Sequence, residues 1–131
     1  MIITVQLLQK YKKYTVNQLI SKATTVFNRF IRNRDRDESC ISCGNFTTLQ
    51  AGHYYSAGRF PALRFNENNV HGQCLKCNYY ESGNLINYRK NLIHKIGIEE
   101  VEKLDRVAEQ SKQNQFKWDA LYLIEIIEKY K

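Results

Sequence analysis

Four cysteines, arranged as two Cys-x-x-Cys pairs, are the residues of this sequence with the clearest capacity for chemistry. Cys40 and Cys43 form the first pair, Cys74 and Cys77 form the second, and 30 residues separate the pairs. Two such pairs can supply four thiolates to one tetrahedral Zn²⁺, which leaves no open position for a substrate. We therefore expect a structural zinc site. Two disulfides or a redox-active pair are the alternatives, and a reducing cytoplasm disfavours both.

Three polar residues lie within or directly after the segment that the cysteine pairs enclose. His53 follows Gly52, Asn69 lies five residues before Cys74, and Asn78 directly follows the last cysteine. This pattern resembles the zinc-bearing HNH, or His-Me finger, nucleases, in which a β-hairpin and a helix form a ββα-metal unit. The resemblance implies an α+β fold with a small zinc-anchored core, flanked by an N-terminal basic helix and by C-terminal helices.

Carried over by position, this resemblance implies a catalytic role for three residues. His53 is the general base, Asn69 is its orienting partner, and Asn78 is a ligand for a catalytic Mg²⁺ or Mn²⁺ ion. An imidazole with a pKa near 6.5 can take a proton from water at neutral pH, and a carboxamide oxygen is a suitable hard ligand. Many HNH nucleases have a metal-binding Asp where this chain has Gly52. The candidates for the second ligand are His71, Glu81 and Glu67, with His71 ranked first because it lies between Asn69 and the second cysteine pair. For His71, a histidine packed by hydrogen bonds in the hairpin is the alternative.

A longer set of motifs is similar to the NinG/Rap family of phage recombination proteins. These motifs are Phe27-Asn28-Arg29-Phe30-Ile31-Arg32, Cys40-x-x-Cys43-Gly44, Ala51-Gly52-His53-Tyr54, Leu63-Arg64-Phe65, Asn69-x-His71-x-Gln73-Cys74-x-x-Cys77-Asn78 and Ser82-Gly83-Asn84-x-x-x-Tyr88-Arg89. The resemblance implies a structure-selective endonuclease that cuts branched DNA such as D-loops and Holliday junctions in the cytoplasm of the phage host. Its candidate partners are a second copy of the chain, since symmetric cutting needs two sites, and a phage recombinase.

Two other functional classes fit the same residues. The first is a noncatalytic zinc module that binds branched DNA for a recombinase. The second is a zinc-containing protein adaptor whose basic segment contacts a protein partner. The preferred branch geometry, the cut position and the oligomeric state do not follow from the sequence.

Positive charge is concentrated at the start of the chain. The net charge is +7, and residues 1–36 hold eight basic side chains against one acidic side chain, so the rest of the sequence is neutral. Such an excess indicates a polyanionic partner, and a solvated helix face is the alternative. The expected DNA-contacting residues are Lys22, Arg29, Arg32, Arg34, Arg36, Arg59, Arg64, Lys76, Arg89 and Lys90.

Aromatic residues flank the expected catalytic residues. Tyr54 and Tyr55 follow His53, and Tyr79 and Tyr80 follow Asn78. These rings either stack on unpaired bases at a junction or pack across the hairpin. For Arg64 and Arg89, stabilisation of charge in the transition state is the alternative to plain phosphate anchoring.

Apolar periodicity predicts helices on both sides of the cysteine-rich segment. The first begins after Thr15, which forms a capping box with Gln18. The others cover Leu85 to Ile96 with Asn84 as the cap, Ile98 to about Gln110, and about Trp118 to Tyr130. Residues 38–80 predict short strands and loops. We expect one domain, divided into a basic segment (1–36), the zinc-bound core (37–96) and a helical pair (97–131).

Composition excludes several classes of protein. The 43% hydrophobic and 25% charged residues are close to globular averages, which argues against a disordered or fibrous chain. No apolar run reaches the roughly 20 residues that cross a bilayer, and the N-terminus lacks the pattern of a secretory signal. We therefore expect a soluble cytoplasmic protein that contacts no membrane.

Overall fold

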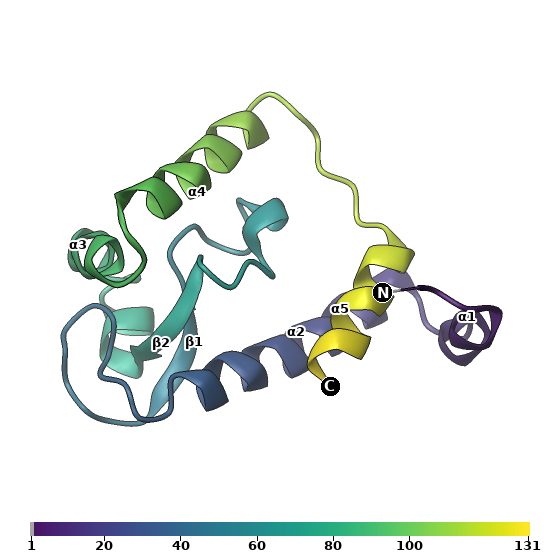
Figure 1. Cartoon of the computed structure of the whole chain (residues 1–131), viewed down its shortest axis with the longest axis horizontal. Helices are drawn as coiled ribbons and strands as arrows, with labels where there is room; N and C mark the ends of the chain where they lie inside the picture. Colours follow the sequence, from purple (N-terminus) through teal and green to yellow (C-terminus); the bar gives the residue numbers. More distant parts are fainter. Residues whose placement is uncertain (1) are drawn as a thin grey trace. The chain divides into compact units, whose positions relative to one another are not determined.

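The computed structural model describes residues 2–131 and combines five α-helices with a two-stranded antiparallel sheet (Figure 1). The chain forms two compact units. The first unit joins the residues up to Phe30 with Lys117–Lys131, and the second comprises Ile31–Phe116. The predicted α+β class is confirmed. Within the described residues, no helix has both the length and the hydrophobicity that are needed to cross a membrane.

The helix α2 (Val16–Arg34) begins as the sequence predicts. The Gln18 N–H donates to the Thr15 hydroxyl at 3.1 Å, and the Thr15 N–H donates to the Gln18 side-chain oxygen at 2.9 Å, which completes the capping box. The apolar positions at helical spacing are buried. They are Leu19, Ala23, Phe27 and Ile31.

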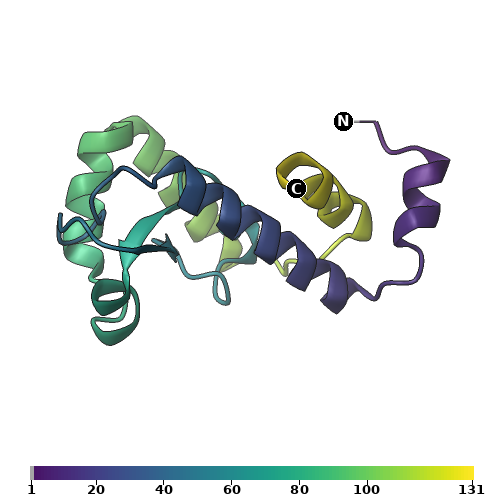
Figure 2. The same ribbon diagram turned by 90° about the horizontal axis from the view of Figure 1, so that it is seen from below.

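The first unit contains α1 (Val5–Tyr11), most of α2 and α5 (Ala120–Tyr130), which Figure 2 shows from a second side. The Tyr130 ring lies 5.0 Å from the Phe27 ring and 4.8 Å from the Phe30 ring, so α5 packs on the apolar side of α2. The Tyr11 hydroxyl donates a short hydrogen bond to Glu128. The sequence analysis missed α1, because seven residues are too few for a clear helical period.

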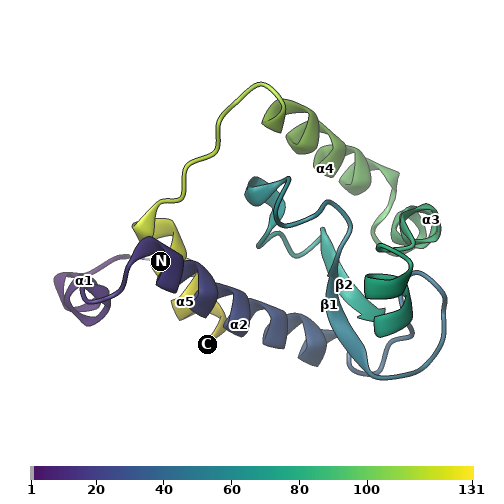
Figure 3. The same ribbon diagram turned by 180° about the vertical axis from the view of Figure 1, so that it is seen from behind.

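The second unit contains the hairpin of β1 (Leu49–His53) and β2 (Val70–Cys74), visible from behind in Figure 3. Its register pairs Gly52 with His71 and His53 with Val70. Because side chains alternate along a strand, His53 and His71 lie on opposite faces of the hairpin. A turn of π-helix, η2 (Lys76–Tyr80), follows β2 almost directly.

Two further helices and a short 3₁₀ turn complete the second unit. They are α3 (Leu85–Ile96), α4 (Ile98–Ser111) and η1 (Pro61–Leu63). Their shared core consists of Ile41, Leu63, Tyr88, Leu92, Val101, Leu104 and Ala108. Gly97 ends α3 with a φ of 90°, as predicted. Asn84 is the N-cap of α3, as predicted, but its backbone is left-handed and its side chain makes no capping hydrogen bond. Its amide donates to the Cys77 sulfur instead.

A buried carboxylate fastens the end of α2 to the hairpin. The Arg34 guanidinium donates to both oxygens of Asp35 at 2.7 and 2.9 Å, and the Gly72 N–H donates to the same carboxylate at 2.8 Å. Burial raises the pKa of Asp35, but these donors outweigh that effect and hold the pKa below its ordinary value. The carboxylate therefore stays charged and bridges α2 to β2.

Substitution Asp35→Ala is expected to lower the free energy of unfolding by about 3 kcal/mol, because it removes the acceptor of the buried Gly72 N–H and the charge partner of the Arg34 guanidinium. Urea denaturation followed by circular dichroism measures this loss. The exposed neighbour Asp37 provides the control, and Asp37→Ala is expected to change stability by less than about 0.5 kcal/mol. Equal stability of the two variants would contradict this role of Asp35.

Candidate active site

The four cysteine sulfurs come together in the second unit, within 4.8 Å of one another. Cys40 and Cys43 lie in the turn after α2, Cys74 ends β2, and Cys77 lies in η2. The Cys43 and Cys74 sulfurs are 3.7 Å apart. An edge of about 3.8 Å is expected for a tetrahedron with Zn–S bonds of about 2.3 Å. The cluster can therefore hold a metal such as zinc.

The surroundings of the sulfurs favour a bound cation. Burial opposes a charge on Cys40, but backbone N–H groups of Ser42, Cys43 and Cys74 lower its pKa to about 7. Burial and the neighbouring thiols raise the pKa of Cys77 to about 12. Four thiolates cannot coexist here at neutral pH without a compensating charge, and a divalent cation supplies that charge.

A hollow of about 400 Å³ lies beside this cluster and brings together two of the predicted site residues. His53 reaches it from the end of β1, and Asn78 reaches it from η2, one residue after Cys77. The complete lining is Ala51, His53, Tyr54, Ser56, Ala57, Asn78, Ser82, Gly83 and Leu85. This lining contains no carboxylate, so the hollow is open to an anionic ligand.

The His53 imidazole is held by a backbone carbonyl. Its Nε2 lies 2.9 Å from the Arg64 carbonyl oxygen, which can only accept a hydrogen bond. The proton of the neutral ring therefore resides on Nε2, and Nδ1 remains a proton acceptor. Burial lowers the pKa of His53, the hydrogen bond to Arg64 opposes that shift, and the charge of Arg64 adds to it. The ring is thus neutral at neutral pH, as a general base must be.

Asn69 is fully buried and organises the backbone around His53. Its side-chain oxygen accepts from the Tyr55 N–H at 2.9 Å, and its amide donates to the carbonyls of Tyr55 and Leu63 at 2.9 and 3.1 Å. Tyr55 lies two residues after His53, and Leu63 directly precedes the carbonyl that His53 binds. Asn69 therefore positions the two segments between which the imidazole lies, and its hydrogen bonds go to backbone groups.

The Asn78 side chain uses its amide nitrogen in a hydrogen bond, which leaves its carbonyl oxygen for a further ligand. Its Nδ2 donates to the Gln50 side-chain oxygen at 2.8 Å. Because this bond uses the nitrogen, the carbonyl oxygen is the atom that can bind a hard cation. Gln50 was not predicted, because nothing in its spacing distinguishes it from other polar residues of a strand.

The structure does not bring His71 into the hollow. The ring is 3% exposed, and its Nδ1 lies 3.5 Å from the Tyr88 hydroxyl. Burial lowers the pKa of His71 to about 3. It is therefore a neutral histidine packed beneath the hairpin, as the alternative interpretation expected. Its position between Asn69 and the second cysteine pair predicts a metal ligand, but the strand register places it on the opposite face of the hairpin from His53.

Gly52 explains why an Asp is absent before His53. A Cβ atom at this position would lie 2.1 Å from the side-chain oxygen of Gln73, which is fully buried. The Gln73 amide donates to the Ser42 hydroxyl at 2.9 Å and to the Gly83 carbonyl at 2.6 Å, so it cannot easily give way. The position therefore admits only glycine.

Two of the arginines expected at DNA have their guanidinium groups engaged within the second unit. Arg34 donates to Asp35 and to the carbonyls of Glu67 and Val70. Arg89 donates to both oxygens of Asp105 at 3.0 and 2.8 Å. Both arginines are thus part of the fold's own ion pairs. No local pattern predicts the Arg89 pair, because Asp105 is 16 residues away.

Other basic residues of the expected set lie exposed. Lys76 is paired with Glu81 at 3.8 Å, and its side chain remains 77% exposed. Arg59 and Arg64 lie near the rings of Phe60 and Phe65. The exposed residues of the set, apart from Arg34, are Lys22, Arg29, Arg32, Arg36, Arg59, Lys76 and Lys90.

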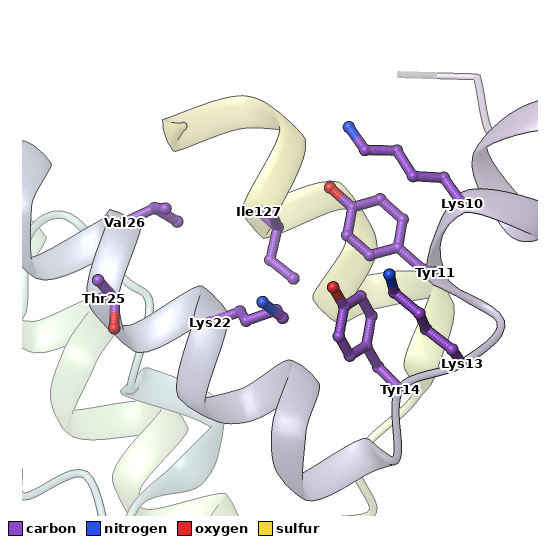
Figure 4. A pocket seen from close by; sticks show the side chains of 8 residues that line it. All are labelled: Lys10, Tyr11, Lys13, Tyr14, Lys22, Thr25, Val26 and Ile127. Carbon is purple, nitrogen blue, oxygen red and sulfur yellow. The ribbon is translucent and has the colours of Figure 1, made fainter.

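A second hollow, of about 490 Å³, lies in the first unit and is rich in hydrogen-bond donors (Figure 4). The ammonium groups of Lys13 and Lys22 lie 5.3 and 4.4 Å from the centre of the Tyr14 ring. Lys10 also lines this hollow and is paired with Glu128 at 3.4 Å. The full lining is Lys10, Tyr11, Lys13, Tyr14, Lys22, Thr25, Val26 and Ile127. This arrangement suits an anion such as a phosphate group.

Comparison with known proteins gives a consistent picture. The family described as "Bacteriophage Lambda NinG protein" matches residues 5–131. The proteins named protein ninG of Escherichia phage lambda and Salmonella phage P22 are 48% and 50% identical over 101 and 88 residues. These alignments cover 76% and 66% of this chain, and 47% and 43% of the relatives. The chain thus spans about half the length of the curated relatives it matches. No solved structure matches it.

Substitution Cys74→Ser is expected to abolish stoichiometric zinc binding and to unfold the second unit, because a site with three sulfurs loses both affinity and the link between β2 and the turn at Cys40. Elemental analysis of the purified protein measures the zinc, and circular dichroism measures the fold. Ser39→Ala, beside the first pair, is the control and should retain one zinc per chain. Full zinc content in the Cys74 variant would contradict a four-sulfur site.

Proposed function

Because the chain belongs to the NinG family of bacteriophage proteins, we propose that it is a metal-dependent endonuclease that hydrolyses phosphodiester bonds in branched DNA. One observation carries the proposal. His53, with a proton-accepting Nδ1, and Asn78, with an unengaged carbonyl oxygen, line one hollow beside a four-cysteine cluster. The two residues come from segments 25 positions apart.

The order of elements supports an HNH-like core. Two antiparallel strands are followed by a helical turn, with His53 at the end of the first strand and Asn78 in the turn. This is the arrangement expected of a ββα-metal unit. The turn is a short π-helix, and the longer α3 begins only at Leu85. A π-turn at a reactive residue is a common feature of functional sites.

The residues that line the hollow and those that support them have distinct tasks in the proposed reaction. The Arg64 carbonyl fixes the His53 tautomer, so that Nδ1 takes a proton from the attacking water. Asn69 holds that carbonyl's segment in place. Asn78 offers its oxygen to Mg²⁺ or Mn²⁺, which when bound neutralises charge on the phosphate and the departing 3′ oxygen. No carboxylate lines the hollow, so Asn78 is the residue there that would hold such an ion.

Exposed basic residues supply the proposed grip on DNA. The first unit carries eight basic and three acidic side chains, whereas the second carries twelve and ten. Contacts to phosphates hold DNA without reading its sequence, which suits recognition by shape. We assign the phosphate contacts to Arg29, Arg32 and the hollow around Lys22. We exclude Arg34 and Arg89, because their guanidinium groups are engaged in ion pairs. A second copy of the chain and a phage recombinase stay predicted partners.

Substitution His53→Ala is expected to reduce Mg²⁺-dependent cleavage of a synthetic four-way junction at least about 100-fold, because water loses its proton acceptor. Binding to the same junction in Ca²⁺ should stay within about twofold of wild type. His94, an exposed histidine of α3, gives the matched control His94→Ala. Binding without cutting by the wild-type protein would instead favour the noncatalytic DNA-binding module.

The pH dependence of cleavage is expected to report the buried imidazole. Because burial lowers the pKa of His53 below 6.5, the base is protonated and inactive only in acid. The value of kcat/KM should rise with pH, with a midpoint below 6.5, and should be flat through neutrality. Initial rates between pH 5 and pH 8 test this, and a midpoint above 7 would argue against His53 as the base.

Charge reversal on α2 is expected to weaken DNA binding. The double variant Arg29→Glu/Arg32→Glu should reduce the slope of log Kd against log salt by about 2, because two phosphate contacts are lost. Lys103→Glu/Lys112→Glu changes the net charge equally on α4 and at its C-terminal end, where both lysines are paired with glutamates. Equal weakening by the two double variants, measured by fluorescence anisotropy, would show that only net charge matters.

A further inference from the structure

Two solvent-exposed tyrosine rings lie on the turn that carries Asn78. Tyr79 and Tyr80 are 72% and 73% exposed and directly follow Asn78 in η2. The chain has nine tyrosines, all among the described residues, and these are the two that the structure leaves exposed. Large rings at this exposure forgo the stabilisation of burial, and these two directly follow Asn78, which lines the hollow.

The other tyrosine pair near the hollow is engaged in the fold. Tyr54 and Tyr55 pack against the core of the second unit. The Tyr55 hydroxyl donates a short hydrogen bond to Asp105, and the Tyr54 hydroxyl accepts from Arg89 at 3.2 Å. The two interpretations of the tyrosines, stacking and packing, therefore apply to different pairs. Packing describes Tyr54 and Tyr55, and leaves Tyr79 and Tyr80 as the rings available to a partner.

The backbone beneath Tyr79 and Tyr80 is held on both sides. Cys77 belongs to the sulfur cluster, and its carbonyl accepts from the Gly83 N–H at 2.8 Å. The Glu81 N–H donates to the Lys76 carbonyl at 2.8 Å. The rings themselves meet edge to face, with centroids 5.1 Å apart and planes at 86°. Their backbone is thus preorganised, and ring faces stay open for stacking.

The chemistry around the rings identifies the partner. Unpaired nucleobases present flat π-faces that stack on aromatic side chains whatever their sequence. The neighbouring hollow has no carboxylate in its lining. The Lys76 side chain in the same turn pairs with Glu81 at 3.8 Å but remains 77% exposed, so it can still meet a phosphate. Bases inside a duplex are already stacked on both faces and cannot use the rings. A branch point exposes bases that can.

We propose that Tyr79 and Tyr80 form a stacking platform for unpaired nucleobases at a DNA branch. This inference rests on the proposed endonuclease function and gives it a source of selectivity. The platform engages bases only where a duplex is interrupted, and its rings adjoin the residue proposed to bind the catalytic metal. Branched DNA is thereby placed with its junction at the hollow, whereas a continuous duplex is held by phosphate contacts alone.

The test compares three variants of the full zinc-bound chain with the wild type. They are Tyr79→Ala/Tyr80→Ala, the conservative Tyr79→Phe/Tyr80→Phe, and Phe46→Ala, which removes an 80% exposed ring elsewhere. Each is titrated in Ca²⁺ with a four-way junction that carries 2-aminopurine at the branch, and with a linear duplex of the same sequence. Affinity and quenching of 2-aminopurine fluorescence are recorded, and cleavage in Mg²⁺ is measured in parallel.

The alanine double variant is expected to bind the junction about tenfold or more weakly, to lose the quenching, and to bind linear duplex as before. The phenylalanine double variant and Phe46→Ala should behave as wild type.

Retention of junction preference and quenching by the alanine double variant would overturn the platform, as would equal losses in the phenylalanine double variant. If the wild-type protein cuts junctions and one of these two results is obtained, the endonuclease proposal is retained and the platform is rejected. Junction binding and quenching with no Mg²⁺-dependent cutting would leave the platform and refute the endonuclease.

Discussion

Convergence of four sulfur atoms is the constraint on which the second unit depends. The cluster joins the turn after α2 to the end of β2 and the turn η2, which are distant from it in the sequence. A hairpin of two five-residue strands is marginal by itself in water. A metal bound by the four cysteines would add folding free energy at the strand end closest to Asn78. The cluster thus holds in place the backbone that carries the proposed reactive residues.

Buried polar side chains hold the rest of the hairpin. Asp35 accepts from the Gly72 N–H, and the Tyr88 hydroxyl donates to the Gly52 carbonyl at 2.7 Å. Asn69 binds the loop that follows β1. Each of these groups is fully or nearly buried, so each hydrogen bond is costly to break. Together they fix the backbone on both sides of His53, although none of them contacts a substrate.

Satisfaction of hydrogen bonds inside the protein also separates the residues of the proposed site from those that serve the fold. A side chain whose hydrogen bonds and charge are satisfied inside the protein has little left for a ligand. Arg34, Arg89, His71, Tyr54 and Tyr55 are in that position. Asn78 keeps an oxygen available, and Tyr79 and Tyr80 keep their rings exposed. The proposed site is therefore distinguished by what the fold leaves unsatisfied.

Much of this organisation could be predicted from local sequence. The capping box at Thr15, the helix end at Gly97, the α3 and α4 helices and the four-cysteine site all follow from spacing and residue type, because they depend on near neighbours or on the chemistry of thiolates. The family also follows from the combined motifs, which the relatives confirm. Three things required the tertiary structure. Strand register decided that His71 faces away from His53, contacts across long separations decided that Asp105 occupies Arg89, and burial decided which tyrosines remain exposed. Each of these depends on residues far apart in the chain, so that no local pattern of sequence encodes them.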